Sequence, residues 1–519
     1  MSPPDQAARD RIATDLETTL FVEAGAGSGK TTALVGRVVA LVTSGAVELR
    51  HIAAITFTEK AGAELRDRVR RELEARAVDQ TTDPSEAERC RVALGQLDGA
   101  AIGTLHAFAQ RLLSEHPVEA ALPPRVEVLD EVSSAVEFDR RWARVLDDLL
   151  ADPGLERTIL LLSCAGVDPT KLRSLALAFE GSWDLVEELV PDTAPEPRAV
   201  ADLVPRIHEA LRPLRDLARH CMDPTDPLLE CLHRFVAYGG ELDGCLDDDL
   251  DLLDCLLAGV DGYRRNAGRA GSWDGRKDEV HARIADVLEA MTSVRRAVLD
   301  GCAHHLGAAL RRHTLGAAEG RRDAGTLEFH DLLVLARRVL RDPVQGPVVR
   351  ASLHQRYQRL LLDEFQDTDP IQIELAVRIA AADPARADEA RWRDVAVAPG
   401  RLFVVGDPKQ SIYRFRRADV GTFLTARDHF APAAGGAVEL TANFRTVAPI
   451  IDWVNHTFAT LLHEPPDTDL AQPSQPAYVD LQAQRAAAAV GPPVAVVGTD
   501  PHPPRTPADV IRSAESRDV

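Results

Sequence analysis

The sequence contains few cysteines and no long apolar run. Its 519 residues include seven cysteines, none of them in a CxxC pair. In a chain of this length such a scatter is typical of reduced thiols in a cytoplasm rather than of a disulfide framework. No stretch of about 18 apolar residues occurs, so no membrane-spanning helix is expected, and residues 1–19 lack the apolar core of a secretion signal. We therefore expect a cytoplasmic protein without a membrane partner.

The sequence also lacks the basic excess that is usual for proteins that grip duplex DNA over a broad face. Lys and Arg number 60 against 81 Asp and Glu, which makes the formal net charge −21. The acid is concentrated in residues 241–254, whereas basic residues cluster in residues 66–71 and 414–417. Net charge concerns solubility and steering rather than a local groove. The balance therefore argues against wrapping duplex DNA and leaves room for a narrow channel that follows one strand.

Short apolar runs alternate with segments of helical periodicity in the first and last parts of the chain. A length of 519 residues favours two to four domains. The alternation predicts an α/β domain with a parallel sheet and helices on both faces. The expected strands are Leu20–Glu23, Ile52–Phe57, Ala101–Thr104, Arg359–Leu362, Leu402–Val405 and Val438–Leu440, and a later one is expected at Val494–Val497.

The middle of the chain has little strand signal. Ala, Leu, Arg and Asp at helical spacing dominate residues 117–325, with Gly- and Pro-containing breaks. We interpret this part as a helical insertion domain that divides the α/β domain into halves at residues 1–116 and 326–440.

A glycine-rich loop follows the first expected strand and precedes a helix. Backbone N–H groups of such a turn at a helix N-terminus form an anion site. In this pattern Lys30 reaches the β- and γ-phosphates, and the Thr31 hydroxyl binds Mg²⁺. Ala24 stands where the pattern usually has its leading glycine. The predicted nucleotide-binding residues of the loop are Ala24, Gly25, Ala26, Gly27, Ser28, Gly29, Lys30, Thr31 and Thr32.

Two carboxylates follow the strand expected at residues 359–362. An ATPase needs one carboxylate to hold the metal and another to polarise water. Asp363 and Glu364 stand in that order, so we predict Asp363 as a Mg²⁺ ligand and Glu364 as general base. An Asp-Glu pair after an apolar run is common on protein surfaces. Its combination with the glycine-rich loop is what predicts an ATP- and Mg²⁺-dependent enzyme.

The segment Asp363 to Pro370 reads Asp-Glu-Phe-Gln-Asp-Thr-Asp-Pro and resembles motif II of the UvrD/RecB-like helicases. These are superfamily-one motors that move 3′ to 5′ on single-stranded DNA. Further segments resemble the family's motif Ia, Thr-x-His-x-Phe motif, motif III and motif IV, in order, at residues 56–65, 104–108, 406–416 and 440–446. The Val-Glu-Ala-Gly start of the loop and the Asp-Pro-Lys-Gln of motif III look more like the RecB/AddA branch. The resemblance implies a P-loop NTPase (RecA-like) domain and a helicase of recombinational DNA repair.

The resemblance implies further nucleotide contacts. Gln6 matches the glutamine that reads adenine, and Phe444 matches an aromatic residue that lies against the adenine ring, where the family usually has tyrosine. Gln410 and Arg445 match residues that meet the γ-phosphate. With Lys30, Asp363 and Glu364, they complete the predicted catalytic set.

The resemblance and the chemistry of the side chains also predict DNA contacts. Flat side chains offer faces on which bases stack whatever the sequence. One of Tyr413 and Phe415 is expected to pack in the core, and we favour Phe415 as the DNA-facing residue. His106 contacts DNA or holds its loop, and Arg66 to Arg71 are expected to be a solvated helix face. The predicted DNA-binding residues are Thr58, Lys60, Thr104, His106, Tyr413, Phe415 and Arg416.

The motifs end before the family's motifs V and VI. We interpret residues 441–519 as motif IV, a linker and the start of an incomplete second motor domain. This predicts a truncated chain that binds ATP, hydrolyses it poorly and does not unwind DNA alone. The expected partners are single-stranded DNA, or duplex with a single-stranded end, and a helicase/nuclease subunit. The alternatives are a P-loop ATPase switch without a DNA role and a non-catalytic DNA-binding or assembly subunit.

Overall fold

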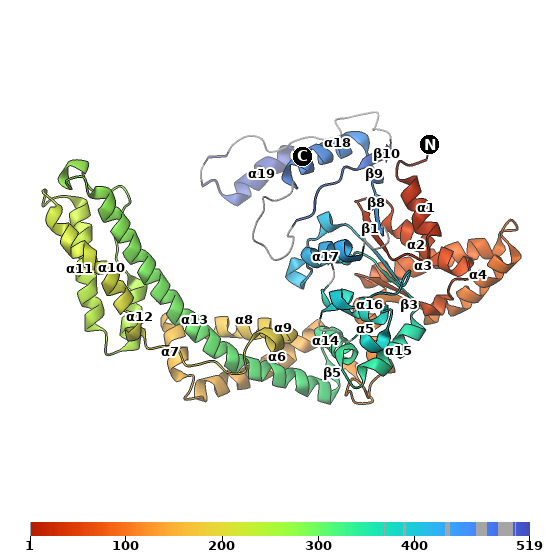
Figure 1. Ribbon diagram of the computed structural model, residues 1–519, viewed down its shortest axis with the longest axis horizontal. Coiled ribbons are helices and arrows are strands. Elements are labelled where there is room, and N and C mark those ends of the chain that lie inside the picture. The colour runs from red at the N-terminus through yellow and green to blue at the C-terminus, as the bar shows by residue number, and fades with distance from the viewer. Residues whose placement is uncertain are drawn as a thin grey trace. The chain divides into compact units, whose positions relative to one another are not determined.

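The chain forms two compact units in the computed structural model. The structure describes residues 2–367, 369–387, 391–430, 436–462, 475–485, 502–503 and 505–518. The first unit combines residues 1–122 with residues 332–519, and the second is residues 123–331. Figure 1 labels the elements of both.

A six-stranded sheet forms the centre of the first unit. Its strand order is β3-β2-β6-β7-β1-β8, and every neighbouring pair is parallel. The expected α/β fold with a parallel sheet is thereby confirmed, and each of the six expected strands is present. Their bounds are β1 (Leu20–Ala24), β2 (Ile52–Thr56), β3 (Ala101–Thr104), β6 (Arg359–Leu362), β7 (Leu402–Gly406) and β8 (Ala437–Leu440).

Helices cover both faces of this sheet, as parallel strands require because both of their faces are apolar. One face packs in a single apolar core with the first four helices. The other face carries Phe21, whose ring meets Phe365 and Phe423 edge-on. The helices are α1 (Gln6–Thr14), α2 (Lys30–Thr43), α3 (Glu59–Val78), α4 (Pro84–Gln96), α5 (Leu105–Glu115), α14 (Phe329–Arg341), α15 (Gly346–Arg356), α16 (Ile371–Ile379) and α17 (Val420–Phe430).

A smaller pairing follows the main sheet. Strand β9 (Ala442–Val447) pairs in parallel with β10 (Gln482–Arg485). Helix α18 (Ala448–Leu461) lies between the two strands in the sequence, and α19 (Ala508–Asp518) is the last element. Asn455 of α18 holds the approach to β10, since its side chain donates to Leu481 O at 2.9 Å and accepts the Leu481 N–H at 3.0 Å. The strand expected at Val494–Val497 lies outside the described residues.

The second unit is helical apart from the short pair β4 (Glu127–Val128) and β5 (Thr326–Leu327). Its longest element, α13 (Lys277–Ala324), has 48 residues and contacts α7, α8, α9, α10 and α12 (Figure 1). From Val280 to Val298 its buried residues recur at alternating intervals of four and three, which is the spacing of one helix face. The remaining helices are α6 (Glu131–Ala151), α7 (Glu156–Cys164), α8 (Pro169–Glu180), α9 (Trp183–Leu189), α10 (Pro205–Leu217), α11 (Pro227–Gly244) and α12 (Asp249–Ala258).

A buried ionic network lies where α13 ends in this unit. Asp331, only 2% exposed, accepts bonds from Arg321 Nε at 2.7 Å and Arg321 Nη2 at 2.9 Å. The indole N–H of Trp183 donates to the same carboxylate at 2.8 Å, and the backbone N–H of Glu328 donates at 2.9 Å. Glu180 approaches Arg321 at 3.3 Å. The charge of Asp331 is thus met by hydrogen-bond donors, as burial requires.

Within the parts of the chain that the structure describes, no helix has both the length and the apolar character needed to cross a membrane. All seven cysteines are free thiols.

Candidate nucleotide and nucleic-acid site

The predicted functional residues of the first unit follow the strands of the main sheet. Because all six strands are parallel, their carboxyl ends lie at one edge of the sheet. Ligands of open α/β sheets bind in the crevice beyond such ends. The phosphate loop follows β1, the two carboxylates follow β6, motif III follows β7 and the predicted motif IV follows β8. The topology therefore brings segments hundreds of residues apart to one edge.

The glycine-rich loop joins β1 directly to α2. Gly29 is the residue before the helix and has a φ of 88°, and Gly27 has a φ of 70°; both values lie in the left-handed region that favours glycine. A Cβ on Gly27 would lie 2.7 Å from Arg445 Cβ. Ser28 is buried, and its hydroxyl donates to Gly25 O at 2.7 Å. The loop is thus tightly folded, with Lys30, Thr31 and Thr32 in the first turn of the helix.

The two carboxylates after β6 differ in environment. Asp363 is 6% exposed. Burial, and next the neighbouring Glu364 carboxylate, raise the pKa of Asp363 to about 7, against the opposing effect of Lys30. Glu364 forms an ion pair with Lys30, with Glu364 Oε2 lying 2.9 Å from Lys30 Nζ. Glu364 also has a φ of 46°, a left-handed value that is uncommon for a residue with a side chain and that often occurs at functional sites.

These groups fit a magnesium nucleotide. Mg²⁺ in such enzymes is held by one or two carboxylates together with phosphate oxygens, rather than by a cage of protein ligands. The buried carboxyl of Asp363 has a raised pKa and could serve as a metal ligand. The Lys30 cation and the N–H groups of the loop could bind the phosphates.

Gln366 connects the carboxylates to motif III, a role that the sequence did not reveal. Its side-chain N–H groups donate to Glu364 Oε2 at 2.9 Å and to Asp367 Oδ2 at 3.1 Å. Its side-chain oxygen accepts the Asp407 N–H at 2.8 Å, and its backbone oxygen accepts the Ser411 hydroxyl at 3.0 Å. One buried amide therefore links the predicted general base to the segment that carries Tyr413 and Phe415. The contacts to Asp407 and Ser411 join the segments that follow the adjacent strands β6 and β7, 41 and 45 residues apart, which is why sequence spacing gives no signal for them.

Gln410 has an intramolecular partner here. Its amide donates to Asp407 Oδ2 at 2.5 Å, and Lys409 Nζ lies 3.1 Å from Asp407 Oδ1. Asp407 is buried, and its side chain holds Lys409 and Gln410 on the short turn that follows β7. This role of Asp407 was not predicted from the sequence.

The β9 segment packs on the phosphate loop. The Asn443 amide donates to Ala26 O at 2.5 Å, and the Phe444 N–H donates to Gly27 O at 2.9 Å. The Arg445 N–H donates to Asn443 Oδ1 at 3.0 Å. Phe444 and Arg445 therefore lie beside the loop, as nucleotide contacts would have to.

Two residues near the N-terminus that were not predicted from the sequence join this assembly. Arg9 pairs with Asp5 through two bonds of 2.8 Å, donates to Ser28 O at 2.9 Å and lies 5.0 Å from the centre of the Phe444 ring. Asp5 also accepts the N–H groups of Thr441 and Ala442, both at 3.0 Å. The spacing of four residues signals a helical ion pair. This spacing cannot reveal the contacts that Arg9 and Asp5 make with Ser28, Thr441 and Ala442.

Gln6 lies one position after Asp5, on α1. Its amide donates to Asp10 Oδ1 at 2.7 Å, within the helix. The structure thus places Gln6 beside the residues that hold the loop.

The motif III aromatic residues differ in exposure. Phe415 is 78% exposed, whereas Tyr413 is half-buried between two rings, with centroid distances of 4.8 Å to Phe57 and 5.7 Å to Phe415. The Arg416 guanidinium lies 6.0 Å from the centre of the Tyr413 ring. Phe57, which was not among the predicted site residues, extends this aromatic cluster.

The remaining predicted DNA contacts follow β2 and β3. Thr58 and Thr104 immediately precede α3 and α5, and their hydroxyls accept the N–H groups of Ala61 at 3.1 Å and Ala107 at 3.2 Å in the first turns of these helices. Thr104 is buried and also donates to Glu59 Oε1 at 2.7 Å. Each threonine thus has a capping role of its own. Lys60 is exposed and His106 is half-buried.

Comparison with known proteins places the fold and the site in context. The family model described as the UvrD/REP helicase N-terminal domain matches residues 5–431. The chain is 30% identical over 515 residues to an ATP-dependent helicase/nuclease subunit from Moorella thermoacetica, covering 88% of this chain and 34% of that protein. A protein of the same name from Desulforudis audaxviator is 30% identical over 501 residues, covering 86% of this chain and 39% of the relative. The protein of the same name from Pediococcus pentosaceus is 25% identical over 503 residues, covering 87% of this chain and 38% of the relative. The chain thus spans little more than a third of the length of these curated relatives.

Proposed function

We propose, from the premise that the chain belongs to the UvrD/REP helicase N-terminal domain family, that it carries the ATP-binding part of an ATP-dependent DNA helicase of recombinational repair. The substrate is single-stranded DNA or duplex with a single-stranded end, and movement is 3′ to 5′. The observation that carries this proposal is the hydrogen-bonded path from Glu364 through Gln366 to the backbone of Asp407 and the hydroxyl of Ser411.

The nucleotide contacts follow from the loop and the carboxylates. Lys30 and the loop N–H groups would bind the phosphates, and the Thr31 hydroxyl and Asp363 would hold Mg²⁺. Bound Mg²⁺ supplies charge neutralisation at the phosphates. Glu364 would accept the proton of the attacking water once Lys30 exchanges its present partner for phosphate. Gln6 and Phe444 are proposed for the adenine, and Gln410 and Arg445 for the γ-phosphate.

The DNA contacts would lie at the same edge of the sheet. Phe415 offers an exposed ring on which a base can stack, a contact that contributes about 1–3 kcal/mol per base whatever the sequence. Lys60, Thr58, Thr104 and His106 are proposed to position the strand through its phosphates and sugars. Because Gln366 touches both Glu364 and the motif III segment, a change at the nucleotide would alter the grip on DNA.

A partner protein is also proposed. The relatives are named as subunits of a helicase/nuclease, and this chain corresponds to about a third of their length. Its seven free thiols support a reducing compartment such as the cytoplasm.

The deciding experiment measures ATP turnover of the chain with and without single-stranded DNA. Turnover that DNA stimulates, and that Lys30→Ala abolishes, is expected. A rate that is independent of DNA would favour a nucleotide switch without a DNA role. No turnover in either condition, despite retained DNA binding, would favour a non-catalytic DNA-binding protein.

A second variant tests the coupling itself. Gln366→Met keeps the length of the side chain but removes its donors and acceptor. We expect ATP binding to persist while stimulation by DNA is lost. Full stimulation in this variant would contradict the proposed path.

A further inference from the structure

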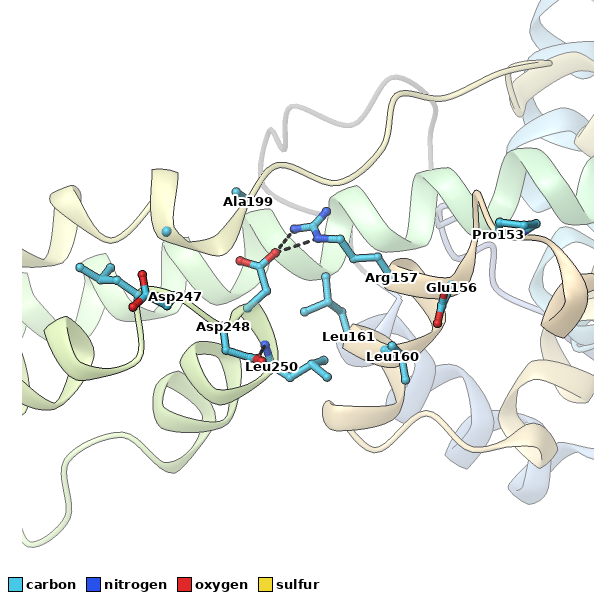
Figure 2. Close-up of a pocket in the computed structure, with 12 residues that line it drawn as sticks. Pro153, Glu156, Arg157, Leu160, Leu161, Ala199, Asp247, Asp248 and Leu250 are labelled. Atoms are coloured by element: carbon cyan, nitrogen blue, oxygen red, sulfur yellow. Dashed lines mark hydrogen bonds and ion pairs between the residues drawn. The ribbon is translucent and has the colours of Figure 1, made fainter.

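The second unit contains a hollow that the proposed helicase chemistry does not use. It has a volume of 550 Å³ and is lined by the start of α7, the segment before α10 and the turn that leads into α12. Its floor is apolar, and two leucines remain open at it: Leu160 is 45% exposed and Leu246 is 39% exposed. Figure 2 shows Leu160, Leu161 and Leu250 between the carboxylates of Glu156 and Asp247.

The frame of this hollow is held in place by one ion pair and its backbone contacts. Arg157 Nε donates to Asp249 Oδ2 at 2.8 Å, and its other nitrogens donate to Pro197 O at 2.5 Å and Arg198 O at 2.9 Å. Asp249 Oδ1 accepts the Val200 N–H at 2.8 Å. Among the described residues that line the hollow, the one cation is therefore neutralised by Asp249 (Figure 2). A preformed site of this kind loses little conformational entropy on binding.

The charge around the hollow is of one sign. Glu156, Asp247 and Asp248 are exposed on its rim. The stretch 241–254 contains seven acidic residues and no Lys or Arg. Such a surface repels nucleic-acid phosphates, whose binding depends on neutralisation by cations. It is complementary to a ligand that combines positive charge with an apolar side chain.

We propose that this hollow docks a basic amphipathic helix of a partner protein. An apolar side chain of that helix would contact Leu160 and Leu246, while Lys or Arg side chains on the flanking turns would face Glu156 and Asp247. Recognition of an apolar helix face by a groove, with charged residues at the rim, is a recurrent mode of peptide binding. The proposal concerns residues 153–250 alone and does not depend on the nucleotide site.

The probe is a synthetic peptide of about 18 residues, roughly five helical turns, with Leu on one face and Lys and Arg on the other. Binding to the full chain is followed by fluorescence anisotropy at roughly 0.15 M salt. We expect saturable binding of one peptide per chain. Two comparison peptides are included, one with Glu replacing every basic residue and one with Ser replacing every Leu, and neither is expected to bind.

Two variants test the site. Glu156→Lys with Asp247→Lys reverses the rim charge at residues for which the structure describes no ion pair, and should weaken binding by about tenfold or more. Leu160→Gln replaces the two apolar methyl groups by a polar amide and should weaken binding by about fivefold or more, which corresponds to ~1 kcal/mol, about the contribution of one buried methylene. The matched control is Glu209→Lys with Glu289→Lys, two exposed acids of the same unit outside the hollow. Circular dichroism checks that each variant is folded.

The control variant distinguishes binding in the hollow from general electrostatic attraction to the acidic chain. Equal weakening in the control pair would show that the net charge of −21, rather than the hollow, attracts the peptide, and would overturn the proposal. Equal binding of the Ser-containing peptide would also overturn it. Labelled single-stranded DNA that, in the absence of peptide, binds the wild-type chain and binds Leu160→Gln more weakly would assign the hollow to nucleic acid instead. Peptide binding that persists in Lys30→Ala separates this result from failure of the proposed ATPase.

Discussion

Two buried aspartates illustrate how differently the two units use charge. In the helical unit, Asp331 accepts bonds from Nε and Nη2 of the Arg321 guanidinium, from the Trp183 indole and from a backbone N–H. In the α/β unit, Asp363 is also buried, but the nearby cation, Lys30, pairs with Glu364. Burial raises the pKa of Asp363 to about 7. A carboxylate whose charge is compensated supports the fold, whereas one that is buried with incomplete compensation is poised for a ligand.

The strongest test of this comparison removes the charge of the predicted general base. Glu364→Gln should lower ATP turnover by about 10²–10⁴-fold, the range for loss of a general base, while ATP binding is kept. Stopped-flow or steady-state turnover measures the rate, and a fluorescent nucleotide measures binding. A variant that retains wild-type turnover would remove Glu364 from the mechanism.

The second test breaks the compensated network. Asp331→Ala should destabilise the helical unit by about 3 kcal/mol, because Arg321 is left buried with a lost partner. Loss of one partner of a buried ion pair usually costs about 3–5 kcal/mol. We expect the low end of this range because Glu180 and Glu328 still approach Arg321 at 3.3 Å and 3.7 Å. Denaturant unfolding followed by circular dichroism measures the loss. The control is Asp323→Ala, an exposed partner of Arg322, for which a change below about 0.5 kcal/mol is expected.

A third test asks whether the exposed Phe415 side chain contributes to DNA binding but not to the stability of the fold. Phe415→Ala should weaken binding of single-stranded DNA by about 1–3 kcal/mol, the contribution of one stacked base. The midpoint of thermal unfolding should stay unchanged because Phe415 is exposed. Fluorescence anisotropy with a labelled oligonucleotide measures the affinity. Tyr413→Ala is the informative partner, since that ring packs on Phe57 and its loss should lower stability as well.

The last test concerns the pKa of Asp363 in the nucleotide-free chain. The folded pKa, about 7, lies above the ordinary value of 3.8. For an acid whose pKa is raised by folding, stability is fully present below the unfolded value and is lost as pH rises toward the folded value. Asp363→Asn avoids this loss and should raise the unfolding midpoint by about 2–4 °C for each kcal/mol recovered.

The pH dependence provides the control for this last variant. The gain in the unfolding midpoint of Asp363→Asn over wild type should be larger at about pH 8 than at about pH 5, where the folded wild-type carboxyl is protonated. A gain of the same size at both values would mean that the amide stabilises by a route other than the lost charge.

The architecture could be predicted because its signals are local. A parallel strand buried on both faces appears as a short apolar run, and a loop of glycines before Lys30 has a specific shape. The six main strands and the α/β class were therefore recognisable one segment at a time. The short strands β9 and β10 were not, because their sequences are largely polar and give no apolar run.

The sequence by itself determined which chemistry-bearing residues follow each strand: Lys30 after the strand at residues 20–24, and Asp363 and Glu364 after the strand at residues 359–362. Only the tertiary structure decided how they are connected. Gln366, after β6, bonds to Asp407 and Ser411, after the neighbouring strand β7, and Asp5 bonds to Thr441, a residue 436 positions later in the chain. The physical reason is that strand order, which juxtaposes these segments, is set by packing of the whole sheet, whereas periodicity and turn chemistry report only on near neighbours in the chain.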